Sequence, residues 1–151
     1  MTIFFYKVCE PYGCFSNFSL HSIQLEGGIW QTSEHYYQAQ KFVGTKDQPL
    51  CQRIYHAPSP EIAAAIGRDP LHFVRPDWDA VKVSIMYNAV LTKFMTYCDL
   101  AEILLSTGEQ MIIENSPTDT FWGCGLEGRG QNHLGKILMR IRQEVRESLT
   151  E

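Results

Sequence analysis

The sequence of 151 residues has no apolar run long enough to span a bilayer, and its first residues, MTIFFYKVCEPYG, contain no hydrophobic segment of signal-peptide length. A membrane-spanning or exported protein is therefore not expected, and the cytoplasm is the predicted location. Internal repeats, low-complexity tracts and an interdomain linker are also missing. A chain of this length, with 44% hydrophobic and 20% charged residues, is expected to fold as one domain over residues 1–151.

The cysteines are odd in number and scattered, and their spacing is not that of a disulfide framework or a zinc site. No Cys-x-x-Cys or His-x-x-x-His pair exists that would arrange ligands tetrahedrally around an ion. Reduced thiols, no metal and no cofactor are therefore predicted. The five cysteines are Cys9, Cys14, Cys51, Cys98 and Cys124.

Excess positive charge is absent as well. The net charge of -4 and the pI near 5.7 argue against a broad electrostatic surface for nucleic acid. A local basic pocket for a single phosphate would not be visible in that sum, so small anionic ligands stay possible.

The pattern of apolar residues predicts a compact, predominantly helical α+β domain with a few short N-terminal and central strands. Strands are expected at residues 3–6 and 111–114, with a hairpin at 23–30 whose two glycines supply positive φ. Helices are expected at residues 33–42, 59–67, 76–97 and 99–107, and in the C-terminal segment, where Asn132 is the predicted cap. Residues 116–130 are predicted to form a long loop, which in a compact domain is usually functional.

The helix that begins near residue 33 carries a polar stripe. Glu34, Gln38 and Lys41 recur at one and two helical turns, so the carboxylate, amide and ammonium are predicted to share a face. Spacing alone favours a solvated face with an ion-pair neighbour over a catalytic role.

Two other groups are candidates for ligand binding. Glycines between Gly123 and Gly135 could bring backbone donors at the start of the last helix close to a phosphate, although glycines serve any irregular loop. A second group combines fixed charges with an indole that could stack on a base, but it fits an ion pair beside a core tryptophan equally well. It comprises Arg68, Asp69, Arg75, Asp77, Trp78 and Lys82.

Several blocks of the sequence together resemble the NADAR family, the YbiA-like proteins. They occur in the family's order over nearly the whole chain. They include YGCFSNF at residues 12–18, WQTSEHYYQAQKF at 30–42, AIGR at 65–68, RPDW at 75–78, WGCG at 122–125 and NHLGKILM at 132–139. Many members have Asp where this chain has Cys124, and the missing carboxylate shifts the expected acidic role to Glu34 and Asp119.

The resemblance implies a compact, largely helical α+β fold and an N-glycosidase. Relatives cleave early phosphorylated ribosylamino-pyrimidine intermediates of riboflavin biosynthesis and release ribose 5-phosphate, and some remove ADP-ribose from guanine bases. A small phosphorylated ribosylamine is therefore the expected partner, with ADP-ribosylated guanine in nucleic acid as the alternative.

The chemistry of the reaction suggests a role for each candidate. Glu34 and Asp119 are the predicted acid–base groups, and Lys41 is the predicted nucleophile, with Lys82 as the alternative lysine. The predicted substrate-binding residues pair with phosphate, stack on the base or orient the sugar. They are Asn17, Gln38, Arg68, Arg75, Trp78, Lys82, Trp122, Gly123 and Asn132.

A binding module that recognises ADP-ribose or a nucleotide without turnover would use the same aromatic residues and arginines. It would need neither Glu34 nor Lys41, and both lie inside the most family-like block. An interaction scaffold is less well supported, because no repeat or coiled-coil seam is present.

Overall fold

The computed structural model describes residues 1–150 of the chain, which divide into two compact units. One unit comprises residues 1–19 and 94–150, and the other comprises residues 20–93. The α+β, mostly helical fold class is confirmed. The expectation of a single domain over residues 1–151 stays a prediction.

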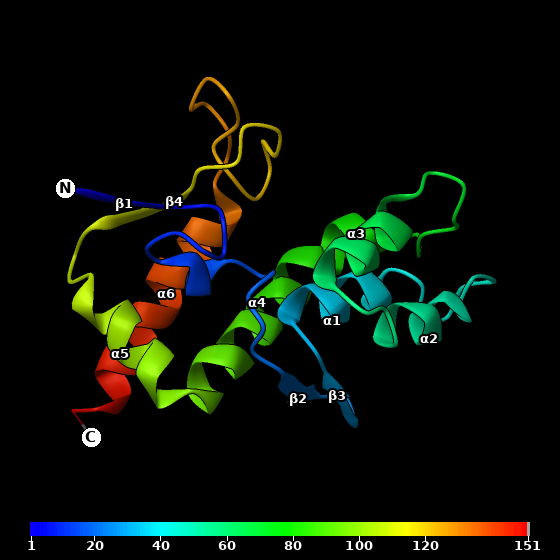
Figure 1. The fold of residues 1–151 in the computed structure, drawn as a ribbon, viewed down its shortest axis with the longest axis horizontal. Helices are drawn as coiled ribbons and strands as arrows, with labels where there is room; N and C mark the ends of the chain where they lie inside the picture. The colour runs from blue at the N-terminus through cyan, green and yellow to red at the C-terminus, as the bar shows by residue number, and fades with distance from the viewer. Residues whose placement is uncertain (151) are drawn as a thin grey trace. The chain divides into compact units, whose positions relative to one another are not determined.

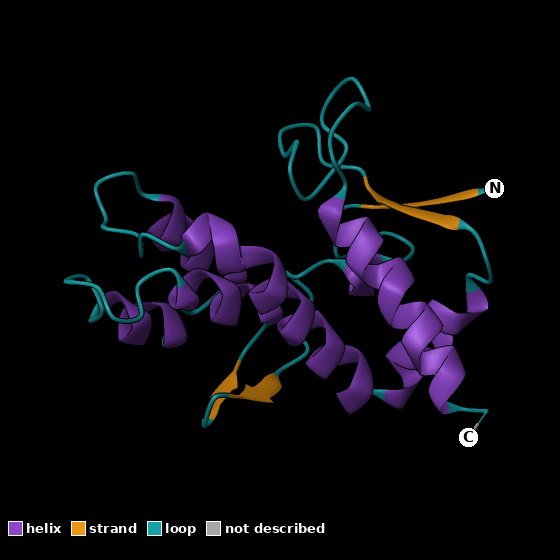
Figure 2. Ribbon diagram, turned by 180° about the vertical axis from the view of Figure 1, so that it is seen from behind, coloured by secondary structure: helices purple, strands orange, loops and turns teal. Residues whose placement is uncertain are grey.

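The unit formed by residues 20–93 contains a hairpin and four helices (Figures 1 and 2). Strands β2 (Ile23–Leu25) and β3 (Gly28–Trp30) pair antiparallel. Positive φ occurs at Glu26 and Gly27, so Gly28 is the first strand residue and not a turn residue as predicted. The helices are α1 (Ser33–Gln40), α2 (Leu50–Tyr55), α3 (Pro60–Arg68) and α4 (Trp78–Thr96), of which α4 lies in this unit up to Lys93.

Local sequence explains where α1 and α3 begin. The Thr32 hydroxyl accepts a hydrogen bond from the backbone N–H of His35, and the Ser59 hydroxyl accepts one from Ile62, with Pro60 at the first helical position. Helix α1 packs against α2 and α3 around a core that includes Phe42, which is fully buried. Other members of this core are Ile23, Trp30, Tyr36, Ala39, Leu50, Ile54, Ala57, Ala63 and Ala89.

The unit formed by residues 1–19 and 94–150 is organised around a parallel strand pair. Strands β1 (Thr2–Phe5) and β4 (Met111–Glu114) are in register from Thr2 opposite Met111 to Phe5 opposite Glu114 (Figure 1). Helix α6 (His133–Ser148) packs on β4, and α5 (Cys98–Ser106) packs on α6. A short 3-10 turn, η1 (Gly13–Phe15), follows β1, and Phe15 contacts the rings of Phe5 and Phe94.

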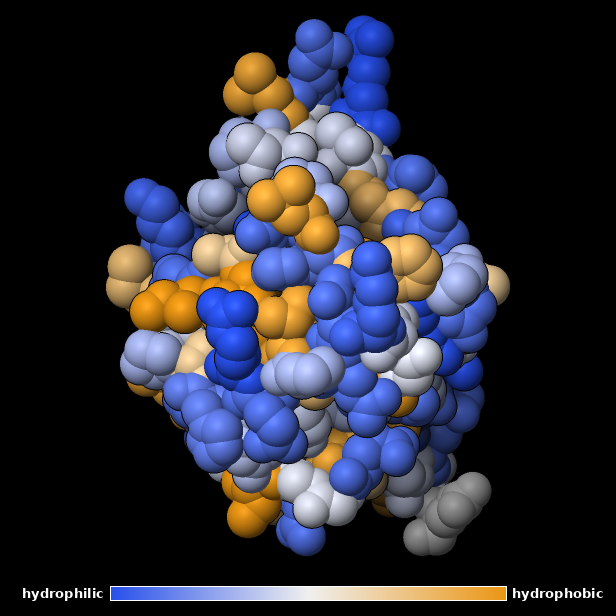
Figure 3. All heavy atoms as spheres, turned by 90° about the vertical axis from the view of Figure 1, so that its right-hand side faces the viewer, coloured by the Kyte–Doolittle hydropathy of each residue, from blue (hydrophilic) through white to orange (hydrophobic). Residues whose placement is uncertain are grey.

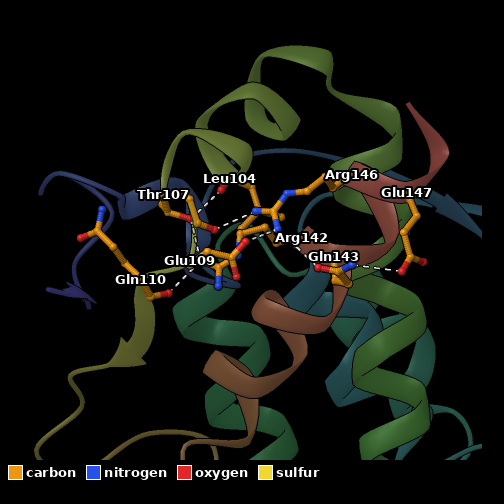
Figure 4. Close-up of polar contacts among 9 residues, drawn as sticks. Leu104, Thr107, Glu109, Gln110, Arg142, Gln143, Arg146 and Glu147 are labelled. Atoms are coloured by element: carbon orange, nitrogen blue, oxygen red, sulfur yellow. Dashed lines mark hydrogen bonds and ion pairs between the residues drawn. The ribbon is translucent and has the colours of Figure 1, made fainter. Parts of the chain in front are cut away.

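The apolar stripe of α6 is buried as predicted, but Arg142 is buried beside it. Its Nη1 donates to Thr107 Oγ1 at 2.9 Å and to the carbonyl of Gln110 at 2.8 Å (Figure 4). Burial lowers the pKa of this guanidinium, and the nearby Arg146 lowers it further. Arg142 therefore links α6 to the turn between α5 and β4.

Among residues 1–150, no helix combines the length and apolar character that crossing a bilayer requires. In the space-filling view, hydrophobic side chains form separate groups among hydrophilic ones (Figure 3). Within residues 20–93, exposed apolar side chains occur in the loops that follow α1 and α3, at Val43, Leu71 and Phe73.

Candidate functional site

The polar stripe predicted on α1 is buried. Glu34 is 4% exposed and Gln38 is 1% exposed, so the solvated-face interpretation of this stripe is wrong. The Gln38 amide nitrogen donates to Glu34 Oε1 at 2.7 Å, one helical turn away. Arg68, at the end of α3, places Nη2 3.9 Å from the same carboxylate oxygen while most of its own side chain stays exposed. The Glu34 carboxylate thus lies between an amide donor and a cation.

The amine of Lys41 belongs to the same cluster. Lys41 directly follows α1, and its Nζ donates to the carbonyl of Gly67 at 3.2 Å. The amine also lies 5.7 Å from the ring centroid of Tyr37 and 6.0 Å from that of Trp78. These neighbours remove water from the amine, and they place a lysine in a largely apolar environment next to a helix end.

This environment changes the acidity of Lys41. Burial lowers the pKa of its ammonium from 10.5 to about 8; the Glu34 charge opposes the change, whereas Arg68 and Lys82 contribute to it. An amine with a pKa near 8 is partly unprotonated at neutral pH, so it can act as a nucleophile. Glu34 and Lys41 thus interact electrostatically, and they combine a carboxylate with an amine of lowered pKa.

The remaining cations near this pair are already engaged by neighbouring carboxylates. Lys82 Nζ lies 3.1 Å from Asp79 Oδ1 on α4. Arg75 donates to both carboxylate oxygens of Asp77, at 2.6 and 2.9 Å, which raises the Arg75 pKa and lowers the Asp77 pKa. The backbone N–H of Arg75 donates to the carbonyl of Lys41 at 2.8 Å, so this loop is held against the end of α1.

Trp78 is mainly a packing residue. It is 9% exposed, and its ring lies 5.1 Å from that of Tyr37. Only a small part of the indole is therefore open to stacking by a base, although the same pair forms the apolar surroundings of Lys41.

Asp119, Trp122 and Gly123 lie in the unit that contains the termini. Asp119 Oδ1 accepts hydrogen bonds from the backbone N–H groups of Phe121 and Trp122, at 2.9 and 2.8 Å. An added Cβ at Gly123 would lie 2.9 Å from the carbonyl of Glu114, which accounts for a glycine there by packing alone. Asn17, in the same unit, is 7% exposed.

Asn132 does not cap α6 through its side chain. It adopts a left-handed conformation, and its amide accepts from the backbone N–H of Glu114 and donates to the carbonyl of Ile112. The N–H groups of residues 131–134 donate to carbonyls of residues 120–123. These four N–H groups are used within the chain and are not donors for a phosphate, so the phosphate site at the start of α6 stays a prediction without their support.

Two residues of the α1–α3 cluster were not predicted as site residues. Tyr37 has no distinguishing signal within its aromatic motif, and the expected helix at 59–67 ends at Gly67. The helix instead continues to Arg68, and Gly67 lies buried inside its last turn. A glycine inside a helix is a signal for close packing, and this signal was available in the sequence. Among the described residues 1–150, no group of three or more His, Cys, Asp or Glu side chains is placed to hold a metal ion.

Comparisons with known proteins assign the class. A protein of Nostoc punctiforme named an N-glycosidase is 57% identical over 99% of this chain and 96% of its own length. The NMR structure of YbiA from Escherichia coli superposes with a TM-score of 0.90 and 38% sequence identity, covering 99% of this chain and 88% of that chain. YbiA is likewise named an N-glycosidase. The chain is therefore a hydrolase of the N-glycosidase class.

The family follows from a match that extends over both units. The NADAR domain profile matches residues 4–146, and the chain belongs to the NADAR family. A chloroplastic maize protein named for riboflavin biosynthesis is 49% identical over 95% of this chain, which spans 25% of that longer protein. The resemblance inferred from the sequence blocks is confirmed.

Proposed function

We propose that this N-glycosidase hydrolyses the ribosyl carbon–nitrogen bond of a phosphorylated ribosylamino-pyrimidine, an early intermediate of riboflavin biosynthesis, and releases ribose 5-phosphate. The observation that carries the proposal is the half-buried Lys41 amine, with its pKa of about 8, in electrostatic contact with the buried Glu34 carboxylate. The names of the maize relative and of a Vibrio vulnificus relative, both riboflavin biosynthesis proteins, support this choice of substrate.

A ribosylamine opens to an imine at C1, and an imine can be captured by an amine. The unprotonated Nζ of Lys41 adds to C1, after which the bond between C1 and the pyrimidine nitrogen breaks and the pyrimidine leaves as a free amine. The sugar then remains joined to Lys41 as an imine. Water adds to C1, the bond to Nζ breaks, and the products are the aldehyde form of ribose 5-phosphate and the free lysine. One water is consumed for each bond that is cleaved.

Glu34 supplies the proton transfers in this scheme. Its carboxylate takes a proton from the attacking amine or water and returns it to the departing nitrogen. The amide of Gln38 fixes one carboxylate oxygen by its 2.7 Å hydrogen bond, so the group that moves the proton has a defined orientation. This arrangement meets the requirement that acid–base groups be positioned before the reaction begins.

Arg68 is the best-supported phosphate ligand among the predicted cations. Most of its side chain is exposed, whereas Arg75 and Lys82 already pair with Asp77 and Asp79. Contributions from Arg75 and Lys82, and from the residues of the other unit, stay predictions. Those residues are Asn17, Asp119, Trp122, Gly123 and Asn132.

Borohydride trapping during turnover tests the proposal. With the ribosylamino-pyrimidine phosphate, the wild-type protein is expected to yield a reduced ribosyl adduct on Lys41, detectable by peptide mass spectrometry. Lys41→Arg keeps the positive charge but cannot form an imine, so it should give no adduct and little activity. Glu34→Gln should lower kcat by about a hundredfold, the usual scale for lost acid–base assistance.

A parallel assay uses a guanine oligonucleotide that carries ADP-ribose, with sugar and base products followed separately. Turnover of the oligonucleotide alone would refute the substrate assignment while leaving the N-glycosidase class intact. Full activity of Lys41→Arg on either substrate would refute the covalent route.

A further inference from the structure

Gly67 is a glycine whose backbone does not require one. It lies in the last turn of α3 without a positive φ, where alanine would favour the helix by about 1 kcal/mol. The reason for a glycine at this position must therefore lie in the residues that surround it. An added Cβ would lie 2.0 Å from Gln38 Oε1, 2.6 Å from Gln38 Cδ and 2.8 Å from Gln38 Cβ. The space that a side chain would need is filled by Gln38.

The Gln38 side chain is positioned by its hydrogen bond to Glu34, although this position leaves its own amide oxygen without a partner. Its amide nitrogen donates to Glu34 Oε1, while its amide oxygen is buried against Gly67 without a hydrogen-bond partner. A buried acceptor without a partner lowers the stability of the folded protein. Reversing the amide would place that oxygen against the carboxylate, so the observed orientation is the one that supports Glu34. A side chain chosen only for packing would avoid this cost.

The other side of Gly67 contacts the second reactive group. Its carbonyl lies in the last turn of α3, where carbonyl groups lack partners within the helix, and it accepts the hydrogen bond from Lys41 Nζ at 3.2 Å. Gly67 therefore contacts Lys41 directly, and it contacts Glu34 indirectly through Gln38, which donates a hydrogen bond to Glu34.

We propose that Gly67 is a positioning residue for the reaction, which aligns Glu34 through Gln38 and holds Lys41 through its carbonyl. The inference deepens the proposed function and rests on the assignment of Glu34 and Lys41 as the reacting pair. Because the Cβ–Cβ distance to Gln38 would be only 2.8 Å, a new side-chain conformation of Gln38 cannot make room for a methyl group. Helices α1 and α3 would have to separate, which would move both contacts at once.

The test compares Gly67→Ala with Ala65→Gly, an exposed position on the same helix, at a temperature where both proteins are folded. Gly67→Ala is expected to lower kcat at least tenfold with a smaller change in KM, because misplacement on the order of 1 Å costs up to about a hundredfold. Ala65→Gly should lower the Tm by roughly 2–4 °C and keep its kcat. A kcat of Gly67→Ala within twofold of wild type would overturn the inference.

A double-mutant cycle separates positioning from general damage. Gln38→Gly removes all three atoms that the added methyl group would meet. Adding Gly67→Ala to Gln38→Gly should then change kcat by less than about twofold, although Gly67→Ala alone has a large effect. If Gly67→Ala alone does not fold, the double variant should fold. Additive losses, or a double variant that also fails to fold, would refute the role through Gln38.

A readout that needs no substrate keeps this inference separate from the proposed function. The rate at which an amine reagent modifies Lys41 is followed against pH by peptide mass spectrometry. In the wild type the midpoint should lie near pH 8, and in Gly67→Ala it should move toward 10.5 as water reaches the amine. An unchanged midpoint would show that Gly67 does not control Lys41. A wild-type protein inactive on the ribosylamine would count against the substrate alone.

Discussion

Replacing Lys41 with methionine should abolish catalysis and stabilise the protein. The change keeps the length and apolar stem of the side chain but removes a charge that is held in a poorly solvated place, between Tyr37 and Trp78. The decrease of the pKa from 10.5 to about 8 sets an upper bound of roughly 3 kcal/mol on the gain, at about 1.36 kcal/mol per pH unit. Residual solvent contact and the lost bond to Gly67 reduce the expected gain to about 1–2 kcal/mol.

The dependence of this gain on pH provides the sharper test. Below about pH 8 the lysine is charged in both the folded and the unfolded state, so the folded state carries the full burial penalty. Between pH 8 and 10.5 the folded protein loses its proton before the unfolded chain does, and the penalty disappears. The advantage of Lys41→Met should thus be largest near pH 7 and approach zero near pH 10.5.

Urea unfolding of the wild type, Lys41→Met and Lys46→Met at pH 7 and at pH 9.5 measures the effect. Lys46 is exposed in the loop after α1, so its replacement controls for the general loss of a lysine. A gain of about 1–2 kcal/mol corresponds to an increase in Tm of roughly 2–8 °C for a chain of this size. A Lys41→Met protein that is less stable than wild type at pH 7, or a gain equal at both pH values, would refute the account of Lys41 as a destabilising charge.

Two further predictions concern buried polar groups outside the reacting pair. The ring nitrogens of His35 form hydrogen bonds with Thr32 and with the carbonyl of Ala57, and burial lowers the pKa of the ring below 6.5. Below about pH 6.5 the unfolded chain takes up a proton that the folded protein does not, so the free energy of unfolding should decrease as the pH falls. Thermal unfolding between pH 7.5 and 5.5 should show a flatter decline for His35→Gln, and parallel declines would contradict the assignment. Arg142→Met should lower the free energy of unfolding by about 2 kcal/mol or more, because Thr107 and Gln110 lose their buried donor; calorimetry showing no loss would mean that water replaces the guanidinium.

Elements with a local signal were predictable from the sequence. The caps Thr32 and Ser59 mark the starts of α1 and α3, and the apolar stripe of α6 is read directly from its spacing. Helix α2 was not predicted, because it has six residues and no side-chain hydrogen bond at its N-cap. A segment of that length is too short to display a helical period, so its helicity depends on packing in the core.

The residues of the candidate site likewise divide into those that a local pattern groups and those that only tertiary packing brings together. Glu34, Gln38 and Lys41 could be grouped because they recur along α1 and the residue that follows it. That Glu34 and Gln38 are buried, and that Gly67 and Arg68 contact this group, depends on the packing of α3 on α1, which no local pattern specifies. The glycines near α6 have a structural explanation that composition does not reveal. Gly130 lies against the backbone of Gly123 and Cys124, and Gly135 lies against the carbonyl of Ile112, so close packing accounts for both glycines.

The electrostatics of the site restrict how a phosphorylated sugar can bind. A phosphate dianion next to Nζ would stabilise the ammonium and raise the Lys41 pKa, and it would thereby remove the unprotonated amine that the reaction needs. The Coulomb interaction between unit charges falls by half when their separation doubles, and solvent screens it further. If the proposed mechanism holds, the phosphate should bind the exposed part of the Arg68 side chain while C1 of the sugar lies at Lys41, because a phosphate held away from Nζ raises the Lys41 pKa less than one beside it.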